Sequence, residues 1–578
     1  MRRRPLALVW TTIAAAVLSG CVSLPESGPV FDAGSAGSST DRVACCYLPN
    51  GPQPGESQTD IVQHFLEAMT ATPIQTSVAR QFLTAPAEAS WDPELETIVY
   101  DDASQPKDED RVEVSVSLTD GYTLDSRGVF AGRLPEVQRT LSFGMDFEAG
   151  QWRIAELRDA LIVPRSWTDD HFQSVDVYYV DPTAGILVPE PVSVPRGEQF
   201  ATALTRSLLS GPGPSLRQVS RNFLPPGLTL GLSDPVGADG VADVALQGDA
   251  SGMSPQEAEL AAVQLAWTLR QDPAIRSLRL TADGEALPGL AREIGVDEGA
   301  EYDPASFSSS TAIFALRDGR VVSGPPDSMT PVDGLVGQRD YGFRDIGLNL
   351  DSTRVAGVSG GGTTVLEGPT YDPDGSVVDV VSGAVDLLPP AWDFADRMWL
   401  VDRTPAGAQV ILRANGRNRL VDVPGISAER VRRFLISRDG SRLLAVIRRS
   451  RGDILVASRI RYDDRGVMRA ALPARQLPWP IEERPRILDI GWQTPTSVAV
   501  LYPIRDLAQV RTLAVDGSPA TLTVASPTLA GDYRWLVGNP EPGVDLFAAT
   551  PQGVTDLSEI ERSTVASDVD LSTLTYTG

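Results

Sequence analysis

The sequence is poor in residues on which several chemistries depend. Its 578 residues include three Cys, two His and a single Lys, Lys107. His64 and His171 lie in different parts of the chain and cannot by themselves build a conventional zinc site. Cys45 and Cys46 are adjacent; a disulfide between them would be strained, and two thiols are too few for a zinc site. We therefore predict no cofactor or metal and assign no role to this cysteine pair.

Basic residues are also outnumbered. The chain carries 76 acidic and 50 basic residues, a formal net charge of −26, which argues against a general nucleic-acid binder because that function needs a basic surface. Hydrophobic residues make up 42% and charged residues 22%, a balance typical of folded domains. The combined share of Gly (51 residues) and Pro (45 residues) in the sequence is above the usual value of about 12%. This excess favours many turns and short strands.

The N-terminus has the organisation of an export signal. Arg2 to Arg4 precede an apolar core, Leu6 to Leu18, that is shorter than the ~20 residues a spanning helix requires. The following Leu18-Ser19-Gly20-Cys21 resembles the lipobox of bacterial lipoproteins. That resemblance implies an S-diacylglyceryl group and an acylated amino group on Cys21 after cleavage, with the mature chain on the extracytoplasmic face of the cell membrane. The alternative is an ordinary signal peptide in which Cys21 is incidental.

Composition and periodicity divide the chain into five parts. We predict a signal peptide (1–20), a lipidated flexible tether (21–58), an α+β domain (59–165), a second α+β domain (172–290) and a domain of repeated strands (300–578).

The first α+β domain begins with helical spacing of apolar residues from Ile61 to Met69, with Thr59 or Asp60 as the expected N-cap. Strict alternation of apolar residues over 112–118 and 141–147 then predicts half-buried antiparallel strands.

The second α+β domain reads as two strand–helix–strand units. We predict strands at 175–179, 186–188, 241–246 and 275–280, and helices over 200–209 and after the capping residue Ser254. The segments Leu208-Leu209-Ser210-Gly211-Pro212 and Leu224-Pro225-Pro226-Gly227 resemble those of GerMN domains, which occur in spore-germination and envelope proteins and carry no known catalytic residues.

In the last domain a polar turn repeatedly precedes an apolar strand. The repeats begin near Asp351, Ala395, Arg438 and Thr494, at intervals of about 44, 43 and 56 residues, against ~40–50 for common propeller blades. The spacing predicts a β-propeller of about six blades, and an irregular β-sandwich is the alternative.

Together these parts resemble the LpqB family of envelope lipoproteins across almost the whole chain. The opening Cys21-Val22-Ser23-Leu24-Pro25 and the segment Asn50-Gly51-Pro52-Gln53-Pro54-Gly55 match that family's pattern. The resemblance implies that the protein binds the ectodomain of a sensor histidine kinase similar to MtrB and modulates MtrA–MtrB two-component signalling and envelope or division processes.

Two motifs raise the question of enzymatic activity. Gly357-Val358-Ser359-Gly360-Gly361 fits the G-x-S-x-G nucleophile elbow, but no histidine follows Ser359 to act as its base. Asp372-Pro373-Asp374-Gly375 resembles the start of a calcium loop without its further ligands, so a β-turn is favoured. We predict a non-enzyme; the alternative is an envelope protein that binds or hydrolyses cell-wall glycan.

One segment departs from the acidic average. From Arg430 to Arg465 there are eleven arginines against four aspartates. Arg448, Arg449 and Arg451 are the candidate surface for an acidic partner, either the kinase ectodomain or an anionic cell-wall polymer. The alternative is a solvated blade edge on which arginines pair with neighbouring acids.

Overall fold

The computed structural model describes residues 47–231, 235–305, 309–479, 484–519, 527–559 and 562–578. Cys21, Cys45, Cys46, the signal peptide and most of the tether lie outside the described residues. Within the described ranges, no helix combines the length and the apolar character needed to cross a membrane.

The first domain packs three short helices against two sheets. The helices are α2 (Gln58–Ala68), α3 (Ser77–Arg80) and α4 (Ala85–Ser90). One sheet has the order β6-β5-β1-β9 and the other β2-β4-β7-β8, with β3 paired to β4. The strands are β1 (Glu96–Tyr100), β2 (Asp102–Ala103), β3 (Lys107–Asp108), β4 (Glu113–Thr119), β5 (Tyr122–Asp125), β6 (Phe130–Arg133), β7 (Thr140–Glu148), β8 (Gln151–Glu156) and β9 (Leu161–Pro164).

The helix predicted to start this domain is present, but its N-cap differs from the expected residue. Ser57 caps α2: its hydroxyl accepts a hydrogen bond from the Asp60 amide at 3.2 Å, and the Asp60 carboxylate accepts one from the Ser57 amide at 3.1 Å. This reciprocal pairing satisfies two amides at the helix start, which neither Thr59 nor Asp60 would do as the cap. Phe65 of α2 packs edge-to-face on Phe143 of β7 and fixes the helix to the sheet.

The second domain follows α5 (Arg165–His171). Strand β10 (Phe172–Val180) pairs antiparallel with β11 (Leu187–Pro195), and β13 (Val241–Gln247) pairs parallel with β14 (Ser277–Ala282). The remaining short strands are β12 (Thr229–Leu230), β15 (Glu285–Ala286) and β16 (Ile294–Gly295).

Both predicted helices of this domain are confirmed. They are α6 (Phe200–Leu209) and α7 (Pro255–Leu269). Ser254 and Glu257 form the capping box of α7, and Gly211 takes φ +74° just beyond α6, a conformation that a residue with a Cβ rarely adopts. The apolar faces of both helices are buried against the strands, and the two strand–helix–strand units share one hydrophobic core.

The last domain is a β-propeller of six sheets, which confirms the predicted fold class. In the order from inner to outer strand, the sheets are β41-β17-β18-β19, β20-β21-β22-β23, β24-β25-β26-β27, β28-β29-β30-β31 with β32 paired to β30, β33-β34-β35-β36 and β37-β38-β39-β40.

The first three blades contain β17 (Phe314–Arg317), β18 (Arg320–Ser323), β19 (Thr330–Pro331), β20 (Phe343–Leu348), β21 (Arg354–Ser359), β22 (Val365–Pro369), β23 (Val378–Val381), β24 (Ala391–Trp392), β25 (Met398–Thr404), β26 (Gly407–Ala414) and β27 (Arg417–Val421), with the short helix α8 (Leu335–Gln338) between β19 and β20.

The other three contain β28 (Val431–Ile436), β29 (Arg442–Arg449), β30 (Gly452–Tyr462), β31 (Met468–Ala471), β32 (Arg475–Gln476), β33 (Asp489–Thr494), β34 (Ser497–Ile504), β35 (Leu507–Ala514), β36 (Thr528–Ala530), β37 (Trp535–Val537), β38 (Phe547–Ala549), β39 (Gly553–Asp556), β40 (Thr564–Ala566) and β41 (Asp570–Thr575).

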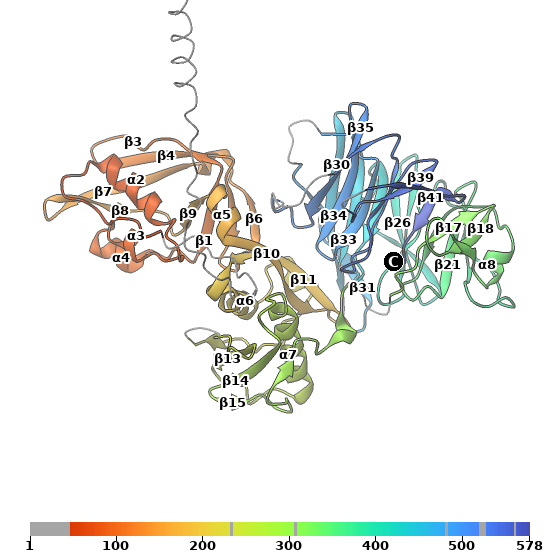
Figure 1. Ribbon diagram of the computed structural model, residues 1–578, viewed down its shortest axis with the longest axis horizontal. Coiled ribbons are helices and arrows are strands. Elements are labelled where there is room, and N and C mark those ends of the chain that lie inside the picture. Colours follow the sequence, from red (N-terminus) through yellow and green to blue (C-terminus); the bar gives the residue numbers. More distant parts are fainter. Residues whose placement is uncertain (1–46, 232–234, 306–308, 480–483, 520–526, 560–561) are drawn as a thin grey trace, which may run out of the picture. The chain divides into compact units, whose positions relative to one another are not determined.

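The ring of blades is closed by the last strand. Each innermost strand contacts the innermost strands of the two neighbouring blades, and β41 lies between β37 and β20. In the first blade, β41 pairs antiparallel with β17, so that Phe314 faces Thr575 and Leu316 faces Asp570 (Figure 1). Two ends of the domain that are distant in sequence thus form one sheet, which leaves few free strand edges.

Candidate functional site

The six innermost strands surround a central cavity of about 430 Å³. Every one of the six contributes lining residues, so the cavity belongs to the ring as a whole and not to one blade. Its apolar wall includes Ile346, Leu388, Leu435, Trp492, Leu536 and Tyr576. The rest of its wall is charged or carries hydroxyl groups, and a cavity of this size lies in the range of sites for small organic ligands.

Paired charges lie along one part of this cavity. The Arg433 Nε donates to the Asp489 carboxylate at 2.7 Å, and Asp489 also accepts from the Leu536 amide at 3.0 Å. Arg344 pairs with both Asp345 and Asp386, at 3.2 and 2.7 Å. Burial raises the pKa of Asp345 despite its neighbouring arginines. These arginines therefore have counter-ions within the protein.

Beside this cavity, an arginine-rich groove lies between the third and fourth blades. We define the arginine groove by its basic residues Arg403, Arg430, Arg432 and Arg448; Asp386 and Glu429 also line it. Burial, followed by the charges of Arg403 and Arg448, lowers the pKa of Arg432. The neighbouring cations thus add to the effect of burial on this pKa.

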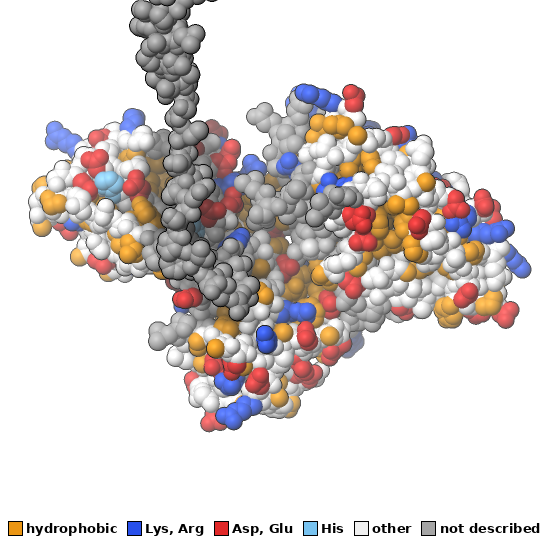
Figure 2. Space-filling model, in the orientation of Figure 1, with side chains coloured by type: hydrophobic (Ala, Val, Ile, Leu, Met, Phe, Trp, Pro, Cys, Tyr) orange, Lys and Arg blue, Asp and Glu red, His pale blue; other side chains and the backbone are white. Residues whose placement is uncertain are grey.

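The three arginines singled out from the sequence occupy different environments at this edge. The Arg448 Nε lies 2.7 Å from an Asp453 oxygen, and Arg449 makes two bonds to Glu429, at 2.5 and 2.9 Å. Arg451 is exposed and forms no ion pair with any residue that the structure describes. Figure 2 likewise shows acidic and basic side chains interspersed over the visible surface.

Sequence reasoning missed Arg403 and did not separate Arg430 and Arg432 from the other arginines. Arg403 belongs to the preceding blade and reaches the groove only because the two blades are adjacent. Arg430 and Arg432 are exposed and form no ion pair with any residue in the described ranges. They are therefore the groove residues most available to a partner.

The G-x-S-x-G motif lies in a β-hairpin. Ser359 is the last residue of β21, its hydroxyl accepts from the Thr364 amide at 3.2 Å, and the chain returns directly as β22. A nucleophile elbow needs a strand followed by a helix, so this is a different geometry.

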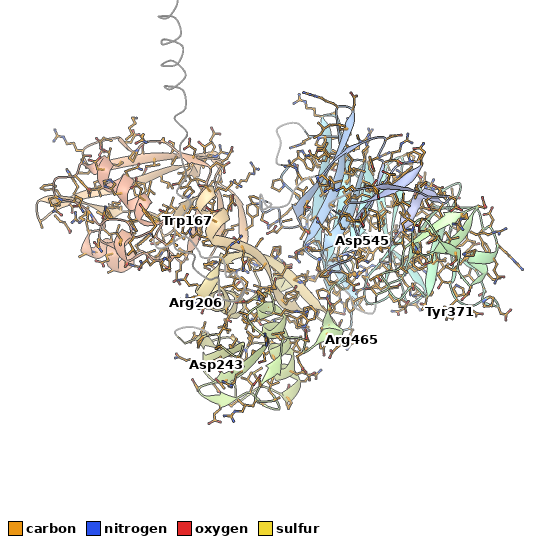
Figure 3. All side chains as sticks on the ribbon, viewed as in Figure 1. Trp167, Arg206, Asp243, Tyr371, Arg465 and Asp545 are labelled. Carbon is orange, nitrogen blue, oxygen red and sulfur yellow. The ribbon has the colours of Figure 1, made fainter. Side chains whose placement is uncertain are left out.

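Both histidines have hydrogen-bond partners within residues 56–171. His64 bonds Glu56 at 2.9 Å, and His171 bonds the Thr72 hydroxyl and the Trp167 carbonyl while stacking on the Trp167 ring, which is labelled in Figure 3. Where the structure describes the chain, no group of three or more His, Cys, Asp or Glu residues could hold a metal ion.

The calcium-like segment after β22 forms a turn. The Asp372 carboxylate accepts from the Asp374 amide at 2.9 Å, and the Asp372 carbonyl accepts from the Gly375 amide at 3.3 Å. These bonds are those of an aspartate that stabilises its own turn.

The fold thus defines a class of protein: two α+β domains joined to a six-bladed propeller with a ligand-sized central cavity. Family models described as "Lipoprotein LpqB, N-terminal domain", "Sporulation and spore germination" and "Lipoprotein LpqB beta-propeller domain" match residues 51–169, 176–288 and 319–564. The chain belongs to the LpqB lipoprotein family.

Curated relatives agree over nearly the full length. The chain is 26% identical to "Lipoprotein LpqB" of Thermobifida fusca, with 95% of each chain covered, and 26% identical to the protein of that name from Streptomyces coelicolor, with 96% of each covered. Among solved structures, similarity extends to a nidogen/laminin complex (TM-score 0.34, 10% identity, 46% of this chain and 98% of the other). It also extends to the tandem GerMN domains of GerM from Bacillus subtilis (TM-score 0.20, 19% identity, 27% and 59%).

Proposed function

We propose that the protein is a lipoprotein anchored through Cys21 to the extracytoplasmic face of the cell membrane. There it binds the ectodomain of a sensor histidine kinase of the MtrB type and modulates MtrA–MtrB signalling and envelope or division processes. Membership of a lipoprotein family and the lipobox at Cys21 support the anchor. The proposal of a kinase partner rests on the resemblance to this family.

The arginine groove is the observation that carries the binding surface. Four arginines line it against two acids, whereas the whole chain has a net charge of −26. A local excess of positive charge on an acidic protein favours an acidic partner, since complementary charge raises the association rate and makes it depend on salt. Arg451, also exposed, extends the same edge beyond the Arg448 and Arg449 pairs.

Binding kinetics test this surface. We expect the variant Arg430→Glu/Arg432→Glu to associate with the purified kinase ectodomain at least about tenfold more slowly at low salt, with a smaller salt dependence. The matched control is Arg461→Glu/Arg465→Glu, which makes the same change of charge at exposed residues; Arg465, labelled in Figure 3, lies in the turn between β30 and β31. Equal rates for the two variants would remove the groove from the interface.

A separate experiment tests the anchor. Cys21→Ser removes the sulfur that would receive lipid, so we expect the protein to remain a precursor or to leave the membrane fraction. Detergent partitioning of wild type and variant measures this directly. A Ser variant that partitions like the wild type would contradict lipidation at Cys21 and leave the groove result unaffected.

A further inference from the structure

Arg438 is a buried cation in the wall of the central cavity. It follows the end of β28, lines the cavity and is 4% exposed. Its Nη1 donates to the Ser309 hydroxyl at 2.9 Å and its Nη2 to the Asn539 side-chain oxygen at 3.0 Å. Both partners are neutral, so neither balances its charge.

No acid in the described part of the chain comes within ion-pair distance of Arg438. Burial lowers its pKa to about 10. Glu541, which has one buried carboxylate oxygen without a hydrogen-bond partner among the described residues, and Asp303 oppose this shift from beyond ion-pair distance. A buried charge without a close counter-ion is costly, and proteins retain one mainly where a ligand supplies the missing charge.

Two hydrogen-bond donors are also left over beside this charge. The Arg438 Nε and the Asn539 Nδ2 are both buried and have no partner among the described residues. Asn539 is held in place, because its oxygen accepts from Arg438 and from the Glu541 amide at 2.9 Å. Of these two residues only Arg438 lines the cavity, so its Nε is the donor that a carboxylate in the cavity would satisfy.

The rest of the cavity limits what the ligand can be. Its other arginines, Arg344, Arg403 and Arg433, are already paired with aspartates, so Arg438 is the lining arginine without an ion pair among the described residues. A dianion such as a phosphate monoester would bring a second buried charge without compensation. The Leu, Ile and Trp side chains provide an apolar part of the wall, against which a ring or alkyl group of the ligand can pack.

We propose that the central cavity of the propeller binds a small organic monocarboxylate, whose carboxylate is held by Arg438 in the cavity wall. Arg403 lines both this cavity and the arginine groove, but Arg438 lines only the cavity, and binding there does not require the proposed kinase partner. The ligand accepts a hydrogen bond from the orphaned Arg438 Nε and balances the buried guanidinium.

Three probes that share a ring and differ in charge test the proposal: benzoate, benzamide and phenyl phosphate. With the full chain purified in detergent at constant ionic strength, we expect saturable benzoate binding by calorimetry and by a change in tryptophan fluorescence, since Trp492 and Trp535 line the cavity. Benzamide and phenyl phosphate should bind at least about tenfold more weakly. No benzoate binding at millimolar concentration, or equal affinity for all three probes, would overturn the proposal.

Two variants assign the binding to this site. Arg438→Met should abolish benzoate binding and raise the melting temperature by about 2 °C or more, because it removes an uncompensated buried charge. Asn539→Asp places a carboxylate beside Arg438 and should have the same two effects by supplying the counter-ion that the ligand would otherwise provide.

The melting temperature separates a ligand site from a purely structural arginine. If Arg438 only holds Ser309 and Asn539 in place, Arg438→Met will melt at a lower temperature. Undiminished benzoate binding by a folded Asn539→Asp or Arg438→Met protein would place the probe elsewhere and also refute the proposal.

Discussion

Two buried arginines in adjacent blades differ in whether a nearby acid balances their charge. Arg397 and Arg438 are 5% and 4% exposed, and each lies in the turn between the first and second strands of its blade. The two turns touch, since the Phe394 amide donates to the Arg438 carbonyl at 2.7 Å. Their backbones are therefore comparable, and what differs is the partner of each guanidinium.

Each arginine has one buried nitrogen without a partner among the described residues, but Arg397 also has the acidic partner that Arg438 lacks. Its Nε bonds Asp393 at 2.8 Å, and its guanidinium carbon lies 3.7 Å from the centre of the Tyr462 ring. Burial opposes its charge, yet the attraction of Asp393 and the other partners prevails and the pKa of Arg397 is raised, whereas that of Arg438 is lowered. A buried arginine is thus structural where the fold supplies an acid, and a candidate for ligand binding where it does not.

The largest effect that tests this contrast is expected for Arg397→Met. The change leaves the Asp393 carboxylate buried without a cation, and it should reduce the free energy of unfolding of the propeller by about 3–5 kcal/mol. Denaturant unfolding of the purified protein measures the loss.

The double variant Arg397→Met/Asp393→Leu supplies its control. It should be less destabilised than Arg397→Met alone, because no uncompensated charge remains. A single variant as stable as wild type would remove the distinction between Arg397 and Arg438.

A smaller effect on stability is expected at Asp176, whose carboxylate has a neutral hydroxyl group as its partner. Its carboxylate accepts from the Thr496 hydroxyl at 3.1 Å, and burial raises its pKa to about 6 against a usual value of 3.8. The folded protein therefore holds this proton more tightly than the unfolded chain, and the associated stability is lost as pH rises from about 4 through 6.

Asp176→Asn should remove that pH dependence. The difference in the free energy of unfolding, variant minus wild type, should increase by on the order of 1 kcal/mol between pH 4 and pH 7. This value is reduced because the side chain is partly exposed. Denaturant unfolding at both pH values measures the difference. A constant difference would show that Asp176 has an ordinary pKa.

The smallest effect is expected at the surface. Arg449 bonds Glu429 through both terminal nitrogens, but the pair is solvent-accessible. Arg449→Ala should change the free energy of unfolding by less than about 1 kcal/mol, and the difference should shrink further in high salt. If Arg449→Ala lowered the free energy of unfolding as much as Arg397→Met does, burial would not determine how much these ion pairs contribute to stability.

Sequence reasoning found the blades through their second strands. The four predicted turn-and-strand repeats correspond to β21, β25, β29 and β34, each the second strand of its blade. These strands are covered on both faces, so they appear in the sequence as continuous apolar runs, such as Leu443 to Ile447. The inner strands gave no such pattern, because some are short; β24 contains only Ala391 and Trp392.

The sites were less predictable for a different reason. The eleven arginines between 430 and 465 were evident, but which of them carry acids as partners depends on residues elsewhere in the ring. Arg433 pairs with Asp489, which lies 56 residues away in the sequence. No local sequence pattern indicates a contact over that separation. Arg438 stands in a polar turn, Arg438-Asp439-Gly440-Ser441, which reads as exposed and is buried only because neighbouring turns cover it.

The closure of the ring by β41 has a consequence for the order in which the protein forms. The Leu316 amide of β17 donates to the Thr573 hydroxyl at 2.8 Å, across a separation of 257 residues. The blade whose strands are synthesised first must therefore wait for the last strand to be synthesised. Contacts of such high sequence separation form slowly, because a long loop has to close before they contribute. Until then the inner edge of β17 is open to pairing with another chain, so the interval before closure is when the domain is most prone to aggregate.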